Sequence, residues 1–208
     1  MWRLLLLLSV LPIVAALLLR WWFGLRVLAA HGRRACRCDP NRWEQAVGMP
    51  LKLTVPSPAT VAQGTSAEPS AVAKPSEQAT SADFGRQLRL AALAQWKQRD
   101  PKRAASRESN RRFGLAVPPL SAMVAVFAAV LAKISVFGAI VIFVLATALA
   151  VMFGLLSLGS ELRAIAITAK ALRGSRAFPR SDDEDATIQC AIAHAWLETV
   201  PPILRLIQ

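Results

Sequence analysis

The chain has 208 residues, and its 25 Lys and Arg against 13 Asp and Glu give a formal net charge of +12. Hydrophobic residues make up 54% of the sequence, but they are concentrated at 4–30 and 115–158, with a polar, proline-dotted stretch between. This distribution is typical of membrane segments and argues against a soluble enzyme with one large core. The three cysteines, Cys36, Cys38 and Cys190, are too few for a disulfide framework.

The first apolar block predicts a membrane helix that acts as a signal anchor. Leu4 to Leu19 carries no charge, and Arg20 is followed by Trp21-Trp22-Phe23, which suits the membrane interface. A cleaved signal peptide is the alternative, because the basic start and the leucine run fit one. Against it, no small-x-small cleavage site follows the run.

The second apolar block predicts a transmembrane hairpin. Leu115 to Leu158 contains one charge, Lys133, and is about twice as long as a single crossing requires. The expected arms run from about Pro119 to Ala132 and from Val136 to Leu158. A single tilted helix from Val136, preceded by a segment in the membrane plane, is the alternative, so whether 115–135 crosses fully stays open.

Basic residues set the expected orientation. They crowd the end of the first span and both ends of the hairpin, so the positive-inside rule places 20–114 and the C-terminus in the cytoplasm and the N-terminus outside. The Arg-rich, Tyr-free composition suggests a bacterial genome, so a multi-pass protein of the bacterial inner membrane is expected. The residues concerned are Arg20, Arg26, Arg33, Arg34, Arg37, Arg99, Lys102, Arg103, Arg107, Arg111, Arg112, Arg163, Lys170, Arg173 and Arg176.

The segment between the apolar blocks divides in two. Residues 53–83 are rich in Pro, Ala, Ser and Thr and predict a disordered linker, because they cannot bury enough surface to offset chain entropy. A helix is expected after Asp83 as its N-cap, with Leu88 and Trp96 among basic positions. That helix could lie on an anionic membrane surface or pack on the rest of the protein.

Two helices are expected after the hairpin. One runs from Glu161 to Arg173, and the next begins after Ser181 as N-cap, with Glu184 completing a capping box. This interpretation assigns the acidic run 182–185 a structural role, since consecutive helical residues cannot converge on one metal ion. The last helix is expected to dock on the hairpin or the bilayer surface before Pro201 and Pro202 end it.

The resulting fold class is an all-α membrane protein. Its predicted parts are a first transmembrane helix with a juxtamembrane extension (1–30), a basic cytoplasmic segment (31–52), the linker (53–83), a basic amphipathic segment (84–114), the hairpin (115–160) and C-terminal cytoplasmic helices (161–208).

Catalytic motifs are missing from the sequence. There is no His-Glu-x-x-His pair, Gly-x-Ser-x-Gly elbow, P-loop or Rossmann fingerprint, and His31 and His194 are far apart. Cys36 and Cys38, near His31 and Asp39, could bind a soft metal, but they do not supply four ligands. A reduced thiol pair without metal or other cofactor is therefore expected there.

The order of elements resembles the bacterial neutral membrane zinc metallopeptidases, best over 115–208. Gly159-Ser-Glu-Leu-Arg-Ala164 resembles the family's Val-Glu-Phe-x-Ala stretch, and 182–185 with the helix from Thr187 resembles its acidic turn and closing helix. By this resemblance Glu161 would take the place of the third zinc ligand. The family's His-Glu-x-x-His helix precedes the hairpin, whereas Leu88 to Lys97 contains neither histidine nor carboxylate.

The resemblance therefore implies a non-catalytic relative that acts as a scaffold or regulator of another membrane protein or forms a homo-oligomer. Besides the lipid bilayer, such a partner is the main expectation. A small structural subunit of a larger, unrelated inner-membrane complex is the alternative. Nucleic-acid binding through 20–114 would depend on Trp43 and Trp96 for stacking, and an active peptidase lacks ligands.

Glu161 lies within about one turn of the end of the apolar run, where a charge needs water or a cation. We expect it to pair with an arginine on the same side of the membrane, and Arg111, Arg112 and Arg163 are the candidates.

Overall fold

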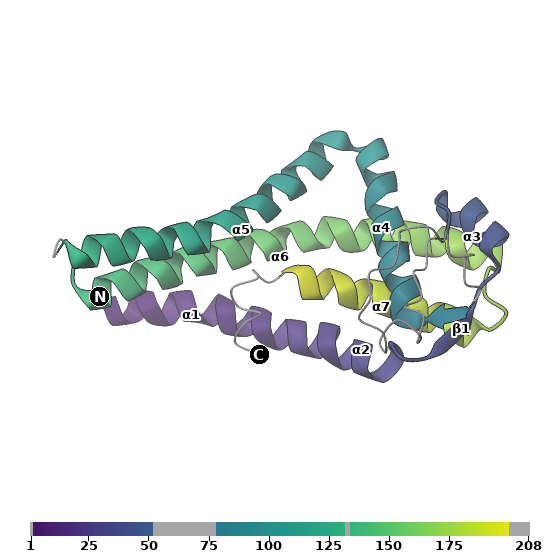
Figure 1. Ribbon diagram of the computed structural model, residues 1–208, viewed down its shortest axis with the longest axis horizontal. Coiled ribbons are helices and arrows are strands. Elements are labelled where there is room, and N and C mark those ends of the chain that lie inside the picture. Colours follow the sequence, from purple (N-terminus) through teal and green to yellow (C-terminus); the bar gives the residue numbers. More distant parts are fainter. Residues whose placement is uncertain (1, 52–77, 132–133, 200–208) are drawn as a thin grey trace, which may run out of the picture.

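The computed structural model describes residues 2–51, 78–131 and 134–199, and these are organised as an apolar arm and a helical head (Figure 1). The described part of the chain is predominantly helical, at 86%. The arm contains α1 (Trp2–Leu19), the C-terminal part of α5 (Pro101–Val130) and the N-terminal part of α6 (Val136–Ser175). The head contains α3 (Pro40–Val47), α4 (Ser81–Arg99), α7 (Ser181–Thr199) and the C-terminal part of α6.

Within the described residues, three helical stretches are long and apolar enough to cross a membrane. They are Ser9–His31, Pro101–Val130 and Val136–Ser175. In the first, α1 continues without a break through a π-helical turn, η1 (Arg20–Leu25), into α2 (Arg26–His31), because the residues at both junctions keep helical backbone angles. The protein is thus compatible with a multi-pass membrane protein, as the hydropathy pattern predicted.

The arm is held together mainly along α6. Helices α5 and α6 lie side by side, and α1 packs on the other side of α6, where Ala16 and Val151 are buried with Ile13, Leu17 and Leu155. The N-terminal end of α1 and the turn between α5 and α6 lie at the same end of the arm, and the head lies at the other (Figure 1).

The predicted hairpin boundaries need correction. Helix α5 begins at Pro101 rather than near Pro119, because Asp100 caps it by accepting a hydrogen bond from the Arg103 backbone N–H at 3.2 Å. It passes through Pro118 and Pro119, which lack the N–H groups that would bond the preceding turn. At the other arm, α6 begins at Val136 as predicted and runs on to Ser175, so the helix expected over Glu161 to Arg173 is its continuation.

The head encloses an apolar core that the sequence pattern indicated only in part. The rings of Trp43, Phe84 and Phe178 pack with centroids 5.4–6.2 Å apart, and Leu88 and Ile165 are fully buried beside them. Of the two placements considered for the helix around Leu88, the structure has the packed one. Helix α7 docks on α4 and α6, in line with the expected contact with the hairpin.

Two short strands depart from the expected all-α class. Strand β1 (Ala35–Arg37) pairs antiparallel with β2 (Gln78–Thr80), with Ala35 opposite Thr80. The end of the predicted linker 53–83 is therefore a strand followed by the first turn of α4, and residues 52–77 lie outside the described part. The two strands satisfy each other's backbone N–H and C=O groups through hydrogen bonds. A local sequence pattern does not reveal this pairing, because the two segments are far apart in the chain.

The helix starts in the head also differ from the predicted ones by a few residues. Thr80, not Asp83, is the N-cap of α4, and Asp83 completes its capping box from the third helical position. The last helix begins at Ser181 itself, with the Arg180 carbonyl accepting from the backbone N–H groups of Asp183 and Glu184. The predicted basic segment 84–114 is divided between α4 and α5 at Asp100.

Candidate functional site

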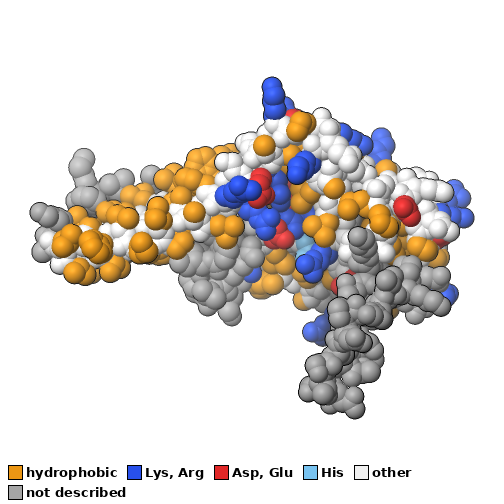
Figure 2. Space-filling model, turned by 45° about the horizontal axis from the view of Figure 1, so that its top comes forward, with side chains coloured by type: hydrophobic (Ala, Val, Ile, Leu, Met, Phe, Trp, Pro, Cys, Tyr) orange, Lys and Arg blue, Asp and Glu red, His pale blue; other side chains and the backbone are white. Residues whose placement is uncertain are grey.

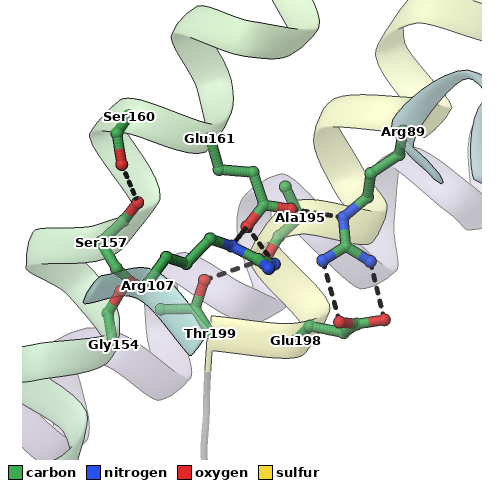
Figure 3. Close-up of polar contacts among 9 residues, drawn as sticks. All are labelled: Arg89, Arg107, Gly154, Ser157, Ser160, Glu161, Ala195, Glu198 and Thr199. Atoms are coloured by element: carbon green, nitrogen blue, oxygen red, sulfur yellow. Dashed lines mark hydrogen bonds and ion pairs between the residues drawn. The ribbon is translucent and has the colours of Figure 1, made fainter. Parts of the chain in front are cut away.

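Glu161 lies at the centre of a network of charged side chains that is buried at Glu161 and Arg89 and opens to solvent at Glu198. Its side chain is 5% exposed on α6, just beyond the most apolar part of that helix. Arg89 Nε of α4 donates to Glu161 Oε1, while Arg107 Nε of α5 donates to Oε2 at 2.8 Å. Both carboxylate oxygens are therefore occupied by guanidinium groups from two other helices (Figure 3).

Arg89 connects this carboxylate to a second one. Its two terminal nitrogens reach both oxygens of Glu198 on α7, at 2.7 and 2.8 Å, in the bidentate geometry that suits guanidinium and carboxylate (Figure 3). Hydrogen bonding to Arg89 holds the pKa of Glu198 at about 2. Burial by itself would lower the pKa of Arg89, but the two carboxylates raise it above its ordinary value. Both groups therefore remain charged at neutral pH.

The network fastens four helices at one point. Arg89 comes from α4, Arg107 from α5, Glu161 from α6 and Glu198 from α7. Arg89 is placed at its depth by the apolar face of α4, because Leu88, Ala91 and Ala92 on either side of it are buried in the head core. A buried charge is tolerated only when it is paired, so these helices must meet with Glu161 between the two arginines.

A polar cavity of about 440 Å³ opens beside the network. Figure 2 shows basic side chains gathered where the apolar arm meets the head. Arg86 and Arg111 are exposed at this cavity and form no contact ion pair with other described residues, whereas Arg89 and Arg107 are paired. The residues lining it are Arg86, Arg89, Leu90, Leu93, Arg107, Arg111, His194 and Glu198.

The expectation that Glu161 pairs with arginine is confirmed, but the three candidate partners were wrong. Arg112 instead pairs with Glu108 on the surface of α5, and Arg111 lines the cavity without reaching Glu161. Arg163 is exposed. The true partner Arg89 had a signal in the sequence, since it stands among the apolar positions of its helix. Arg107 and Glu198 had none, because their contacts depend on how α5 and α7 pack.

The residues considered for a soft metal are brought only partly together. Cys36 and Cys38 are buried, and Cys36 Sγ lies 3.3 Å from Ser81 Oγ. Asp39 caps α3, and His31 ends α2. Burial raises the pKa of Cys38 to about 12, so this thiol is protonated at neutral pH. Within the described residues there is no group of three or more His, Cys, Asp or Glu that could hold a metal ion.

His194 belongs to the wall of the cavity rather than to a ligand set. Its Nε2 lies 3.1 Å from the Ala82 carbonyl oxygen, which can only accept, so Nε2 carries the proton. Burial lowers the pKa of His194, and the nearby Arg89 and Arg86 act in the same direction.

The acidic run 182–185 forms ion pairs with two arginines of the head. Asp183 lies 2.7 Å from Arg34 Nε, and Asp185 lies 2.7 Å from a terminal nitrogen of Arg173. These pairs tie the start of α7 to the chain after α2 and to the end of α6. Trp43, considered for nucleic-acid stacking, is 1% exposed and belongs to the core.

No family model matches the chain, and neither a curated protein nor a solved structure does so.

Proposed function

We propose that this protein is a non-catalytic membrane scaffold or regulator that binds another membrane protein, and that it is a degenerate relative of the bacterial neutral membrane zinc metallopeptidases. The observation that carries the proposal is Glu161 between Arg89 and Arg107. A hydrolytic zinc needs three protein ligands and an open position. At the position that the resemblance assigns to a ligand, two guanidinium groups neutralise the carboxylate and repel a divalent cation.

The same network supports a scaffolding role. It links α4 and α7 of the head to α5 and α6, which extend into the arm. A partner bound along the arm would thereby be held in a fixed relation to the head. Buried charges of this kind favour one arrangement of helices, because any other arrangement leaves a charge unpaired.

Part of the arm surface is apolar in a pattern that suits another helix. Met123, Val126, Phe127 and Val130 of α5 are 63–77% exposed and recur at helical spacing. In a bilayer this stripe faces lipid or a neighbouring transmembrane helix. We place the head in the cytoplasm of a bacterial inner membrane on the basis of the positive-inside rule.

Photocrosslinking tests the scaffold role. A photoreactive amino acid is placed at Phe127 in the full chain, and at Leu7 on α1 as an equally exposed control position. A discrete adduct with a different membrane protein from Phe127, absent from Leu7, would support the proposal. Lipid adducts alone at both positions would contradict it.

A peptidase assay tests the absence of catalysis. The purified chain with added zinc is compared with the variants Glu161→Gln and Glu108→Gln on peptide substrates. We expect no hydrolysis by any of the three. Hydrolysis that is lost in Glu161→Gln and retained in Glu108→Gln would overturn the non-catalytic assignment.

A structural subunit of a larger membrane complex is the second candidate, and the thin packing of the arm favours it. At most 28% of each apolar span is buried inside the protein. A subunit of this kind should lose its fold in detergent when separated from its neighbours, whereas a scaffold or regulator should stay folded alone. Circular dichroism of the isolated chain distinguishes the two.

A further inference from the structure

We propose that the cavity at the junction of arm and head, called here the arginine pocket, is a binding site for a phosphate group, presented by an anionic lipid headgroup. The pocket has a volume of about 440 Å³, and its charged lining consists of Arg86, Arg89, Arg107, Arg111 and Glu198. Nothing in this proposal depends on the scaffold function. It requires only that the arm lies in a membrane.

The charges that line the arginine pocket do not balance. Among the described residues, the four guanidinium groups of the pocket meet two carboxylates, Glu161 and Glu198, which leaves an excess of two positive charges. That excess resides on Arg86 and Arg111, which are exposed and form no contact ion pair with a described residue. A phosphate accepts several charge-assisted hydrogen bonds from guanidinium groups and would balance this excess.

The arginine pocket is also preorganised for an anion. Arg89 is 3% exposed and is fixed by three contacts to two carboxylates, and Arg107 is held by Glu161. An anion therefore meets guanidinium groups that are already ordered, and only Arg86 and Arg111 lose side-chain freedom on binding. Surface arginines scattered singly would lack this advantage.

The position of the arginine pocket along the molecule suits a lipid headgroup. The pocket lies where the apolar surface of the arm gives way to the mixed surface of the head (Figure 2). With the arm in a bilayer, this level is that of the lipid headgroups, and basic pockets beside transmembrane helices are suited to anionic ones.

A neighbouring hollow suits the rest of a lipid. It has a volume of about 510 Å³, lies between α4 and α5, and shares Leu93 and Arg107 with the arginine pocket. Ala94, Trp96 and Ala104 give it a largely apolar wall. A phosphate with an apolar attachment could occupy both spaces, whereas inorganic phosphate would use the first alone.

The test measures binding to the full chain in detergent micelles. The probes are phosphatidylglycerol, phosphatidylcholine and inorganic phosphate, followed by native mass spectrometry and by the shift in unfolding temperature. The pocket variant is Arg86→Gln with Arg111→Gln, which leaves the Glu161 network intact. The matched control is Arg163→Gln with Arg180→Gln, which removes the same charge from exposed positions that do not line the pocket.

We expect wild type and control to bind phosphatidylglycerol at least about tenfold more tightly than phosphatidylcholine. The pocket variant should bind phosphatidylglycerol about tenfold more weakly than wild type, because two charge-assisted hydrogen bonds are lost. Competition by millimolar phosphate would identify the phosphate group as the element recognised. If inorganic phosphate binds wild type but not the pocket variant, and the two lipids bind equally well, the site would be supported but assigned to free phosphate.

Equal phosphatidylglycerol binding by wild type and the pocket variant would overturn the proposal. If the pocket variant fails to fold, the binding of the two lipids and of phosphate to wild type decides whether the proposal holds. Absence of both lipid preference and phosphate binding in wild type would likewise overturn it.

Discussion

The sequence predicts that the carboxylate of Glu161 needs a cation, and the structure shows which arginines provide it. In the sequence it is an isolated acid at the end of an apolar run, and in the structure it joins the buried Arg89 and the partly buried Arg107. Its presence was predictable as a charge that needs a cation. Arg89 stood out as an arginine among the apolar positions of its helix, but its pairing with Glu161, 72 residues away, depends on helix packing. Arg107, 54 residues from Glu161, had no such signal.

Neutralising Glu161 should destabilise the protein far more than neutralising an exposed glutamate. Glu161→Gln leaves Arg89 and Arg107 without that buried counter-charge and should cost about 2 to 4 kcal/mol of unfolding free energy. The matched control Glu108→Gln breaks an exposed pair with Arg112 and should cost less than about 1 kcal/mol. Denaturant unfolding in detergent, followed by circular dichroism, measures both, and equal losses would contradict the assigned role of the network.

Stability should fall on acidification in two stages. The pKa of His194 is lowered in the folded protein, so below the ordinary value of 6.5 the unfolded chain takes up this proton first and is favoured. The lowered pKa of Glu198 adds a second loss as pH falls from 4.5 toward about 2.

Unfolding temperatures measured from pH 8 to pH 3 check this prediction. His194→Gln retains an N–H donor for the Ala82 carbonyl and should remove the first stage only. A profile that is flat between pH 7 and pH 5 in wild type would contradict the part assigned to His194.

At the scale of elements, local signals were sufficient wherever an element is defined by its own residues. The apolar run gave the start of α6 at Val136, and the acidic first turn of α7 indicated its beginning within one residue. The strands could not be found this way, because residues 35–37 pair with 78–80 across the chain. The start of α5 was missed although Asp100-Pro101 is a good helix start, since Pro118 and Pro119 gave a stronger but misleading signal for a boundary.

The crossing of α4 over α7 depends on one glycine. A Cβ placed at Gly85 would come within 2.6 Å of Cys190 Cβ and 2.8 Å of the Ala191 backbone nitrogen, so the helices would have to separate. Gly85→Ala should therefore destabilise the protein by about 1 to 3 kcal/mol. Gly159→Ala is the control, because nothing lies within 4 Å of a Cβ there, and it should stabilise α6 by up to about 1 kcal/mol. If both substitutions changed the unfolding free energy in the same direction, the close packing at Gly85 would be refuted.

At the scale of the whole molecule, composition indicated the arm but not the head. Apolar runs long enough to span a bilayer stand out in any sequence, and all three candidate spans were indicated in this way. The head core consists of a few large side chains, such as Trp43, Phe84 and Phe178, that come from separate segments and are surrounded in sequence by basic residues. Their convergence, and with it the position of the arginine pocket, follows from tertiary packing.

The basic residues are distributed unevenly along the molecule, and this predicts how the arm is oriented in the membrane. The head carries most basic residues, whereas the opposite end of the arm holds the N-terminus of α1 and the tip between α5 and α6. By the positive-inside rule the head should be cytoplasmic and the tip external.

Single cysteines report this orientation at two exposed positions, Gln98→Cys in the head and Leu131→Cys at the tip. The parent chain gives the background, because its native thiols are buried. An impermeant maleimide applied to intact spheroplasts should label Leu131→Cys at once and Gln98→Cys only after lysis. The reverse pattern would invert the orientation, and immediate labelling of both would mean that no membrane separates the head from the tip, which would also deprive the arginine pocket of its place among the lipid headgroups.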